Sequence, residues 1–115
     1  MELRCQADSE LEGTTIVELK GSLDVQGALD LWERVTPELD ADRPSLLIDL
    51  SSVDLITSAG IGALVRLLHR VQSLDGRIAL FGPNQRVREV IKVVMLAEIF
   101  NLSDTVEEAR RHLRS

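Results

Sequence analysis

The spacing of apolar residues along the chain predicts alternating strands and helices. Residues 3–7 and 15–19 are β-rich segments on either side of a polar turn, a pattern typical of an antiparallel pair of strands. From Val25 the apolar positions recur every three or four residues, which predicts a helix over residues 25–39 with Asp24 as its N-cap. We expect one face of this helix to point inward; it carries Val25, Ala28, Leu29, Trp32, Val35 and Leu39.

An apolar run at residues 46–50 predicts a central strand with both faces covered. A short crossing segment, residues 51–56, then leads to an amphipathic helix that opens with Thr57-Ser58-Ala59-Gly60 and ends before Gly76. Thr57 or Ser58 is in position to cap this helix. Its predicted inner face carries Ile61, Leu64, Val65, Leu68 and Val71.

The remaining segments continue the alternation. Residues 77–81 predict a buried strand, Pro83 stands near the start of a third helix, and residues 99–102 could complete the edge of the sheet. Ser103 or Asp104 would cap a last helix. The predicted inner positions of these two helices are Val87, Val90, Ile91 and Val94, and then Val106, Ala109 and Leu113.

The order ββαβαβαβα predicts an α/β fold, because parallel strands joined by helices need right-handed crossovers. We expect one domain over residues 1–115, with a mostly parallel mixed sheet of about five strands and helices packed against it. Hydrophobic residues make up 44% of the chain and aromatic residues 3%, so the core should be aliphatic.

Composition also limits the environment and the partners. The single cysteine, Cys5, cannot form an internal disulfide, which suits a reducing compartment, and we expect it to be a buried strand thiol. No apolar stretch reaches the roughly 18 residues of a membrane span. These features predict a cytoplasmic protein without membrane insertion. The net charge of −6 repels a phosphate backbone, so nucleic acid is not an expected partner.

Metal and hydrolase chemistry find little support in the sequence. Cys5, His69 and His112 lack the paired spacing of metal ligands, and no metal site is predicted. His69 follows Ser58 by eleven residues on the same predicted helix, about 16 Å along its axis at 1.5 Å per residue. These two side chains cannot form a nucleophile and base pair. The basic end of the chain, Arg110, Arg111, His112 and Arg114, is interpreted as cations that offset the dipole of the last helix.

Nucleotide-dependent catalysis is also weakly supported. Gly60-Ile61-Gly62 forms half of a dinucleotide fingerprint, but Val65 occupies the third glycine position. Asp49 and Asp54 flank the end of the central strand, where carboxylates more often cap and solvate a turn than perform acid–base work. A small nucleotide-binding enzyme therefore remains a minor alternative, and we expect a protein that is not an enzyme and needs no cofactor.

The start of the helix at Thr57 is unusual because its first turn carries almost no side chains. An interior glycine costs a helix about 1 kcal/mol relative to alanine, so something should offset this weak start. The structural interpretation is that the glycines permit tight packing on the sheet. The functional interpretation adds that bare backbone lets another protein approach the Ser58 hydroxyl closely.

The run IDLSSVDLITSAGIGALVRLL, residues 48–68, resembles the signature of STAS domains, specifically that of the bacterial anti-sigma factor antagonists. Gly21-Ser22-Leu23-Asp24 resembles the G-E-L-D of this family before its first helix. Residues 82–100 resemble its late helix and L-x-x-[IL]-F ending. The similarity covers essentially the whole chain, in order and with similar spacing.

This resemblance implies a regulatory role for Ser58. In the family the matching serine is phosphorylated by the anti-sigma factor, which is also a serine kinase. The unphosphorylated antagonist binds that kinase and releases the sigma factor; phosphorylation breaks the complex, and a phosphatase restores it. The resemblance implies a partner-binding site at Asp24, Thr57, Ser58, Ala59, Gly60 and Ile61, with Thr57 where many members carry aspartate. The alternative is a STAS scaffold or regulatory subunit of a stress-signalling or transporter complex, without a phosphorylation cycle.

Overall fold

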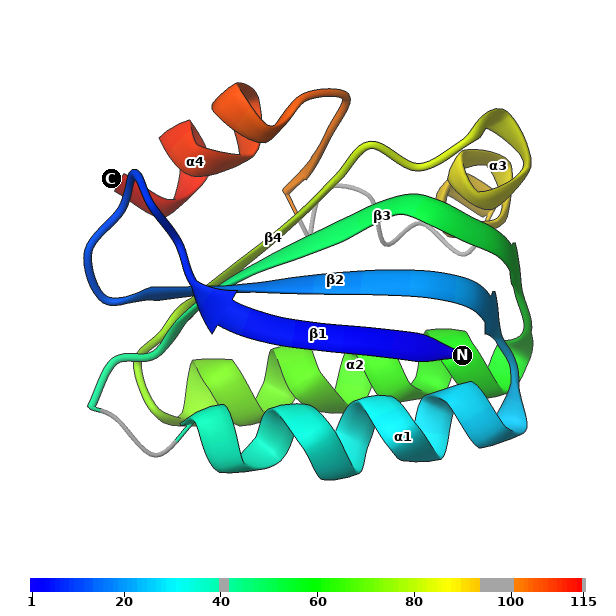
Figure 1. Cartoon of the computed structure of the whole chain (residues 1–115), viewed down its shortest axis with the longest axis horizontal. Coiled ribbons are helices and arrows are strands. Elements are labelled where there is room, and N and C mark those ends of the chain that lie inside the picture. The colour runs from blue at the N-terminus through cyan, green and yellow to red at the C-terminus, as the bar shows by residue number, and fades with distance from the viewer. Residues whose placement is uncertain (40–41, 94–100, 115) are drawn as a thin grey trace.

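The computed structural model describes residues 1–39, 42–93 and 101–114. Its five strands form one sheet in the order β1-β2-β3-β4-β5 (Figure 1). The first strand is antiparallel to the second, and every other neighbouring pair is parallel. This arrangement confirms the predicted α/β class and the mostly parallel mixed sheet. The strands are β1 (Glu2–Ala7), β2 (Thr14–Leu23), β3 (Ser45–Ile56), β4 (Arg77–Phe81) and β5 (Leu102–Ser103).

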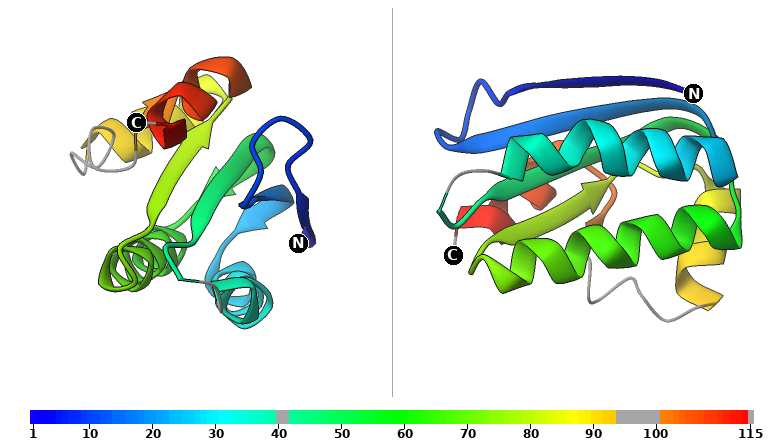
Figure 2. Two further views of the ribbon diagram at one scale, coloured as in Figure 1. Left: turned by 90° about the vertical axis from the view of Figure 1, so that its left-hand side faces the viewer. Right: turned by 90° about the horizontal axis from the view of Figure 1, so that it is seen from below.

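Helices lie on both sides of this sheet (Figures 1 and 2). One face is covered by α1 (Val25–Val35), which a 3-10 turn extends over Thr36–Leu39, and by α2 (Ser58–Ser73). The opposite face is partly covered by α4 (Val106–Arg114), and α3 (Gln85–Val93) packs against β3. Within the described residues no helix is long and apolar enough to cross a membrane.

The central strand β3 is buried on both faces, as its apolar run predicts. Leu46 and Ile48 join the larger hydrophobic cluster, which also contains the inner faces of α1 and α2. Leu47 points the other way and joins a second cluster under α4, together with Ala79, Phe81 and Ala109. The inner face predicted for α2 is confirmed, because Leu64, Leu68 and Val71 are buried and Ile61 and Val65 are half-buried.

Two strands extend further than the sequence predicts. Residues 21–23 continue β2 instead of breaking it, and residues 51–56 belong to β3 instead of forming a crossing segment. The pairing shifts register between Glu18 and Lys20 and again between Gly21 and Ser22. Each such irregularity disturbs the two-residue alternation of side chains, so the apolar pattern no longer signals a strand.

The inner face of α1 also differs from the prediction. Gly27, Leu31 and Val35 are buried, whereas Val25 is 75% and Leu29 is 50% exposed. The helix turns Gly27 toward the sheet, where a Cβ atom would lie 2.7 Å from the carbonyl oxygen of Ser22. Only glycine permits this close approach, and the resulting rotation leaves Val25 and Leu29 in solvent.

Trp32 and Cys5 lie at the margin of the core. The Trp32 side chain is half-buried, with the guanidinium carbon of Arg66 4.0 Å from its ring centroid. The predicted core tryptophan is thus a contact between α1 and α2. The Cys5 thiol is half-buried, and this burial raises its pKa.

The late segments follow the predicted order with shifted boundaries. Strand β5 begins at Leu102 and Asn101 lies in a turn before it, whereas residues 99–100 of the predicted strand and Val94 lie outside the described residues. Thr105 caps α4, because its hydroxyl oxygen accepts a hydrogen bond of 3.3 Å from the backbone N–H of Glu108. The predicted caps, Ser103 and Asp104, are therefore wrong by one or two residues. The predicted inner positions Val87, Ile91 and Ala109 are buried, and Val90, Val106 and Leu113 are half-buried.

Candidate functional site

The starts of α1 and α2 lie side by side at one end of the sheet (Figures 1 and 2). Strands β2 and β3 are parallel and in register at their last residues, Leu23 and Ile56. One residue after each strand is the cap of a helix, Asp24 for α1 and Thr57 for α2. The parallel pairing therefore brings together two segments that are separated by about thirty residues of sequence.

Thr57 joins α2 to the end of β2. Its backbone N–H and its hydroxyl both donate to the carbonyl oxygen of Leu23, at 3.1 and 3.3 Å. The same hydroxyl accepts a long bond of 3.5 Å from the N–H of Gly60. Thr57 is thus the N-cap, which settles the choice that the sequence left open between Thr57 and Ser58.

Ser58 is the first residue of α2 and its side chain is exposed. In the part of the chain that the structure describes, the capping role belongs to Thr57, so Ser58 is not needed to satisfy the first N–H groups of the helix. Its hydroxyl is therefore presented at a fixed position on a buried support.

Gly60 is required by the packing of α2 on the sheet. A Cβ atom there would lie 2.3 Å from the carbonyl oxygen of Leu23, 2.8 Å from Leu23 Cγ and 3.1 Å from Ile56 Cγ1. By contrast, a Cβ atom on Gly62 would meet nothing within 4 Å. Tight packing explains the first of these two glycines and gives no reason for the second.

Asp24 is the N-cap of α1, as predicted. Its backbone is extended, and Oδ1 accepts a hydrogen bond of 3.0 Å from the N–H of Gly27. Of the two carboxylates expected at the end of the central strand, Asp49 lies within β3 and accepts a hydrogen bond of 2.9 Å from the N–H of Ser51. Asp54 is exposed to solvent. The Asp49 contact agrees with the local structural role expected of these carboxylates.

Leu23, the last residue of β2, links most of the predicted site residues. Asp24 follows Leu23 in the chain, and Thr57 donates hydrogen bonds to the Leu23 carbonyl oxygen. Ser58 follows Thr57 in the chain. Ala59 and Ile61 are half-buried, and Ile61 packs against the main core cluster, which limits how much of it a partner could reach. Sequence reasoning missed the exposed Val25 and Leu29 beside this site, because their helical spacing is also that of core residues.

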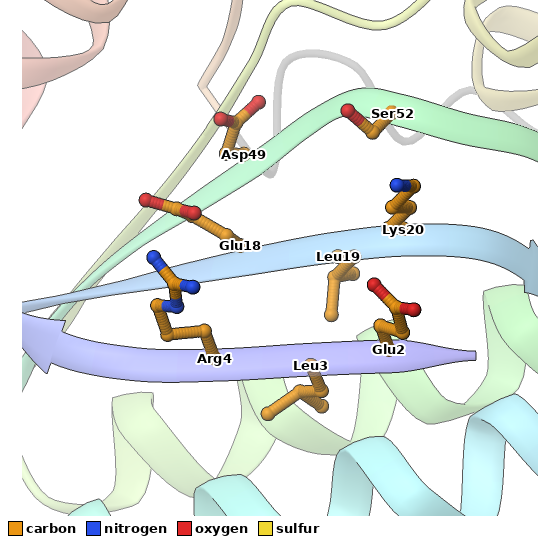
Figure 3. A pocket seen from close by; sticks show the side chains of 8 residues that line it. All are labelled: Glu2, Leu3, Arg4, Glu18, Leu19, Lys20, Asp49 and Ser52. Atoms are coloured by element: carbon orange, nitrogen blue, oxygen red, sulfur yellow. The ribbon is translucent and has the colours of Figure 1, made fainter.

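A shallow polar hollow lies elsewhere, on the sheet face opposite α1 and α2 (Figure 3). On this face Glu2 stands opposite Lys20 and Arg4 stands opposite Glu18 on the antiparallel strands β1 and β2. Opposite charges that face one another across two strands stabilise their pairing. This structural role explains the charged residues of the hollow without a bound ligand. Among the described residues, no cluster of three or more His, Cys, Asp or Glu side chains could hold a metal ion.

A buried ion pair between Asp8 and Arg110 lies at the opposite end of the molecule from the starts of α1 and α2. Arg110 of α4 makes two hydrogen bonds to Asp8 in the turn between β1 and β2, Nε to Oδ2 at 3.0 Å and Nη2 to Oδ1 at 2.8 Å. The Arg110 guanidinium lowers the pKa of the Asp8 carboxyl. Arg110 is therefore half of an ion pair and not only a cation that offsets the helix dipole.

Comparison with known proteins identifies the family of this fold. The family model of the STAS domain matches residues 7–109, so the chain belongs to the STAS domain family. A curated relative from Thermotoga neapolitana, named as a candidate anti-sigma factor antagonist, is 39% identical over 64 residues. The match covers 56% of this chain and 57% of that relative's length.

Solved structures share the fold over nearly the whole chain. A crystal structure of a candidate anti-sigma factor antagonist from Thermotoga maritima has a TM-score of 0.86 and 25% identity, and covers 98% of this chain and 95% of that one. The phosphorylated form of Bacillus SpoIIAA has a TM-score of 0.68 and 18% identity, and covers 94% of this chain and 97% of its own. The resemblance to STAS proteins named as anti-sigma factor antagonists is thus confirmed.

Proposed function

We propose that this chain is a cytoplasmic anti-sigma factor antagonist that binds an anti-sigma factor with serine kinase activity and is switched off by phosphorylation of Ser58. The observation that carries the proposal is the exposed hydroxyl of Ser58 at the first position of α2, with Thr57 as the cap. SpoIIAA, which shares this fold, has been solved in a phosphorylated form. In the proposed cycle, binding of the unphosphorylated protein frees the sigma factor, and a phosphatase removes the phosphate.

The proposed partner-binding residues are Asp24, Thr57, Ser58, Ala59, Gly60 and Ile61. Ser58 contributes only a hydroxyl, so ATP, Mg²⁺ and the catalytic groups belong to the kinase. The chain itself acts as a substrate and ligand and not as an enzyme.

A phosphate on Ser58 would add about −1.5 to −2 charges at a helix amino terminus, where free N–H groups and the helix dipole favour anions. It would leave the Thr57 cap in place, because that cap uses a different hydroxyl. We therefore expect phosphorylation to act at the surface, through bulk and through the cost of desolvating a dianion in a close interface, without unfolding the domain.

The test uses purified anti-sigma factor kinases encoded in the same genome, with Mg-ATP. Mass spectrometry should locate one phosphate on Ser58 of the wild type and none on Ser58→Ala. Ser58→Ala should keep its affinity for the kinase, and Ser58→Asp should weaken it. Equal binding of both variants would contradict the switch, and a stable complex without phosphate transfer would favour the scaffold alternative.

Hydrogen exchange tests the mechanism separately. Backbone protection in α2 and β3 should be similar in the phosphorylated and unphosphorylated forms. A wide loss of protection on phosphorylation would show that the switch acts by unfolding.

A further inference from the structure

The last helix, α4, packs on the sheet through a narrow apolar stripe. Of its nine residues only Ala109 is buried, and Val106 and Leu113 are half-buried. A helix of this length is not stable by itself in water, because isolated helices shorter than about 12–15 residues are marginal even with favourable sequences. The helical state of α4 therefore depends on its contacts with the rest of the protein.

A buried ion pair joins α4 to the other end of the chain. Arg110 donates two hydrogen bonds to the carboxylate of Asp8, whose side chain is only 2% exposed. Asp8 lies in the turn between β1 and β2, which Figure 1 shows beside α4. A two-pronged charged contact is stronger and more directional than a single neutral hydrogen bond. A carboxylate that stays buried after losing its partner is strongly destabilising.

The residues before α4 are held independently of this ion pair. The carbonyl oxygen of Ser103 in β5 accepts a hydrogen bond of 3.0 Å from the N–H of Gly82. The carboxylate of Asp104 pairs with Arg88 of α3. The next residue, Thr105, is exposed, and its hydroxyl bonds within α4. Rotation at Thr105 would therefore move α4 while β5 stays paired with β4.

A separate apolar cluster lies beneath α4. It contains Leu47 of β3 and Ala79 and Phe81 of β4, all of them buried. The larger cluster contains the inner faces of α1 and α2, which lie on the other side of the sheet (Figure 2). Removal of α4 would thus expose the smaller cluster and leave the larger one covered.

We propose that α4 is a lid that opens separately from the rest of the domain, with Thr105 as its hinge and the Asp8–Arg110 ion pair as its latch. Opening breaks the ion pair, unwinds α4 and exposes the apolar face of β3 and β4. Local opening of this kind is expected where few buried apolar contacts hold an element in place. The inference is independent of the proposed function, because no residue of the Ser58 site takes part.

Hydrogen exchange of the full chain, followed residue by residue by NMR at pH 7 in low concentrations of urea, tests the lid. The amide of Ala109 in α4 should be at least about a hundredfold less protected than that of Ile48 in β3. Its protection should also depend less on urea, because a local opening exposes little surface. Equal protection and equal urea dependence at the two amides would show that α4 opens only with the whole domain, and the lid would be wrong.

Substitutions of the charged residues test the latch. Arg110→Gln should lower the protection of Ala109 at least about tenfold, because it leaves the Asp8 carboxylate buried without its partner. Arg111→Gln, at the exposed neighbouring arginine, is the matched control and should change this protection less than about twofold. The double variant Asp8→Asn/Arg110→Gln should be better protected than Arg110→Gln alone, since no buried charge is left unpaired. Equal effects of Arg110→Gln and Arg111→Gln would overturn the latch.

A thiol placed under α4 tests whether opening exposes the sheet. In a Cys5→Ser background, Ala79→Cys puts the single thiol beneath α4, and Ala63→Cys puts it in the larger cluster beneath α2. Iodoacetamide should modify the thiol of Ala79→Cys at least about tenfold faster than that of Ala63→Cys, because only the first is uncovered by the lid. Equal rates would show that α4 unwinds without leaving the sheet, which would overturn the lid.

Discussion

Replacement of Gly60 by alanine should destabilise the protein, although alanine favours helices. The new Cβ would lie 2.3 Å from the carbonyl oxygen of Leu23, and this nearest atom belongs to the backbone of β2, which cannot rotate away as a side chain could. Relief requires α2 to move outward, at a cost of about 1–3 kcal/mol for overpacking. That movement also weakens the two hydrogen bonds from Thr57 to the Leu23 carbonyl oxygen, which lowers the free energy of unfolding by about 1 kcal/mol more.

The gain in helix propensity offsets about 1 kcal/mol of this cost. The net effect is about 2 kcal/mol, or about 8 °C in the thermal midpoint of a domain of this size. Thermal and urea unfolding followed by far-UV circular dichroism would measure the loss, with Gly62→Ala as the control that should shift the midpoint upward. Two midpoints that move together, in either direction, would refute the argument from close approach.

Three further predictions concern contacts away from Gly60. The pKa of Asp8 is lowered from its ordinary 3.8, so its ion pair with Arg110 contributes stability above that pH and loses it as the pH falls. Asp8→Asn should therefore cost about 1–2 kcal/mol at pH 7 and flatten the stability profile below pH 4 in urea titrations. Arg66→Ala should alter the fluorescence of Trp32, because it removes the cation from the indole ring. It should lower the free energy of unfolding by no more than about 1 kcal/mol, because the pair is partly exposed. Asn84→Ala should destabilise by about 1–2 kcal/mol, measured by thermal unfolding, since this side chain caps α3 and donates to the Val53 carbonyl.

Hydrophobic spacing was sufficient to predict the order of the elements but not where each strand ends. The apolar run at residues 46–50 is a reliable signal because it is buried on both faces. Beyond Leu50 the strand continues with two exposed serines, and its pairing with β2 is irregular, so periodicity is lost. Irregular pairing depends on the neighbouring strand, which local sequence does not specify.

The places of the candidate site residues in the fold were predictable from the sequence, but their contacts were not. Asp24 precedes a helical pattern and caps α1, as expected for its residue type. Thr57 and Ser58 are adjacent hydroxyls with the same capping chemistry, and only the contact with the Leu23 carbonyl decides between them. The exposure of Val25 and Leu29 depends on how Gly27 seats α1 against β2, which is a long-range property of the fold.

The division of roles between two adjacent hydroxyls has a consequence for the proposed switch. A serine that capped its own helix would exchange its hydroxyl acceptor for a charged phosphate when phosphorylated, and modification would then be coupled to helix stability. Here Thr57 holds the cap and the contact with β2, whereas the Ser58 side chain faces solvent. The proposed phosphate can therefore change the charge of the surface while the cap remains. Capping by Thr57 therefore accounts both for the fixed start of α2 and for the expectation that the proposed switch acts at the surface without unfolding the helix.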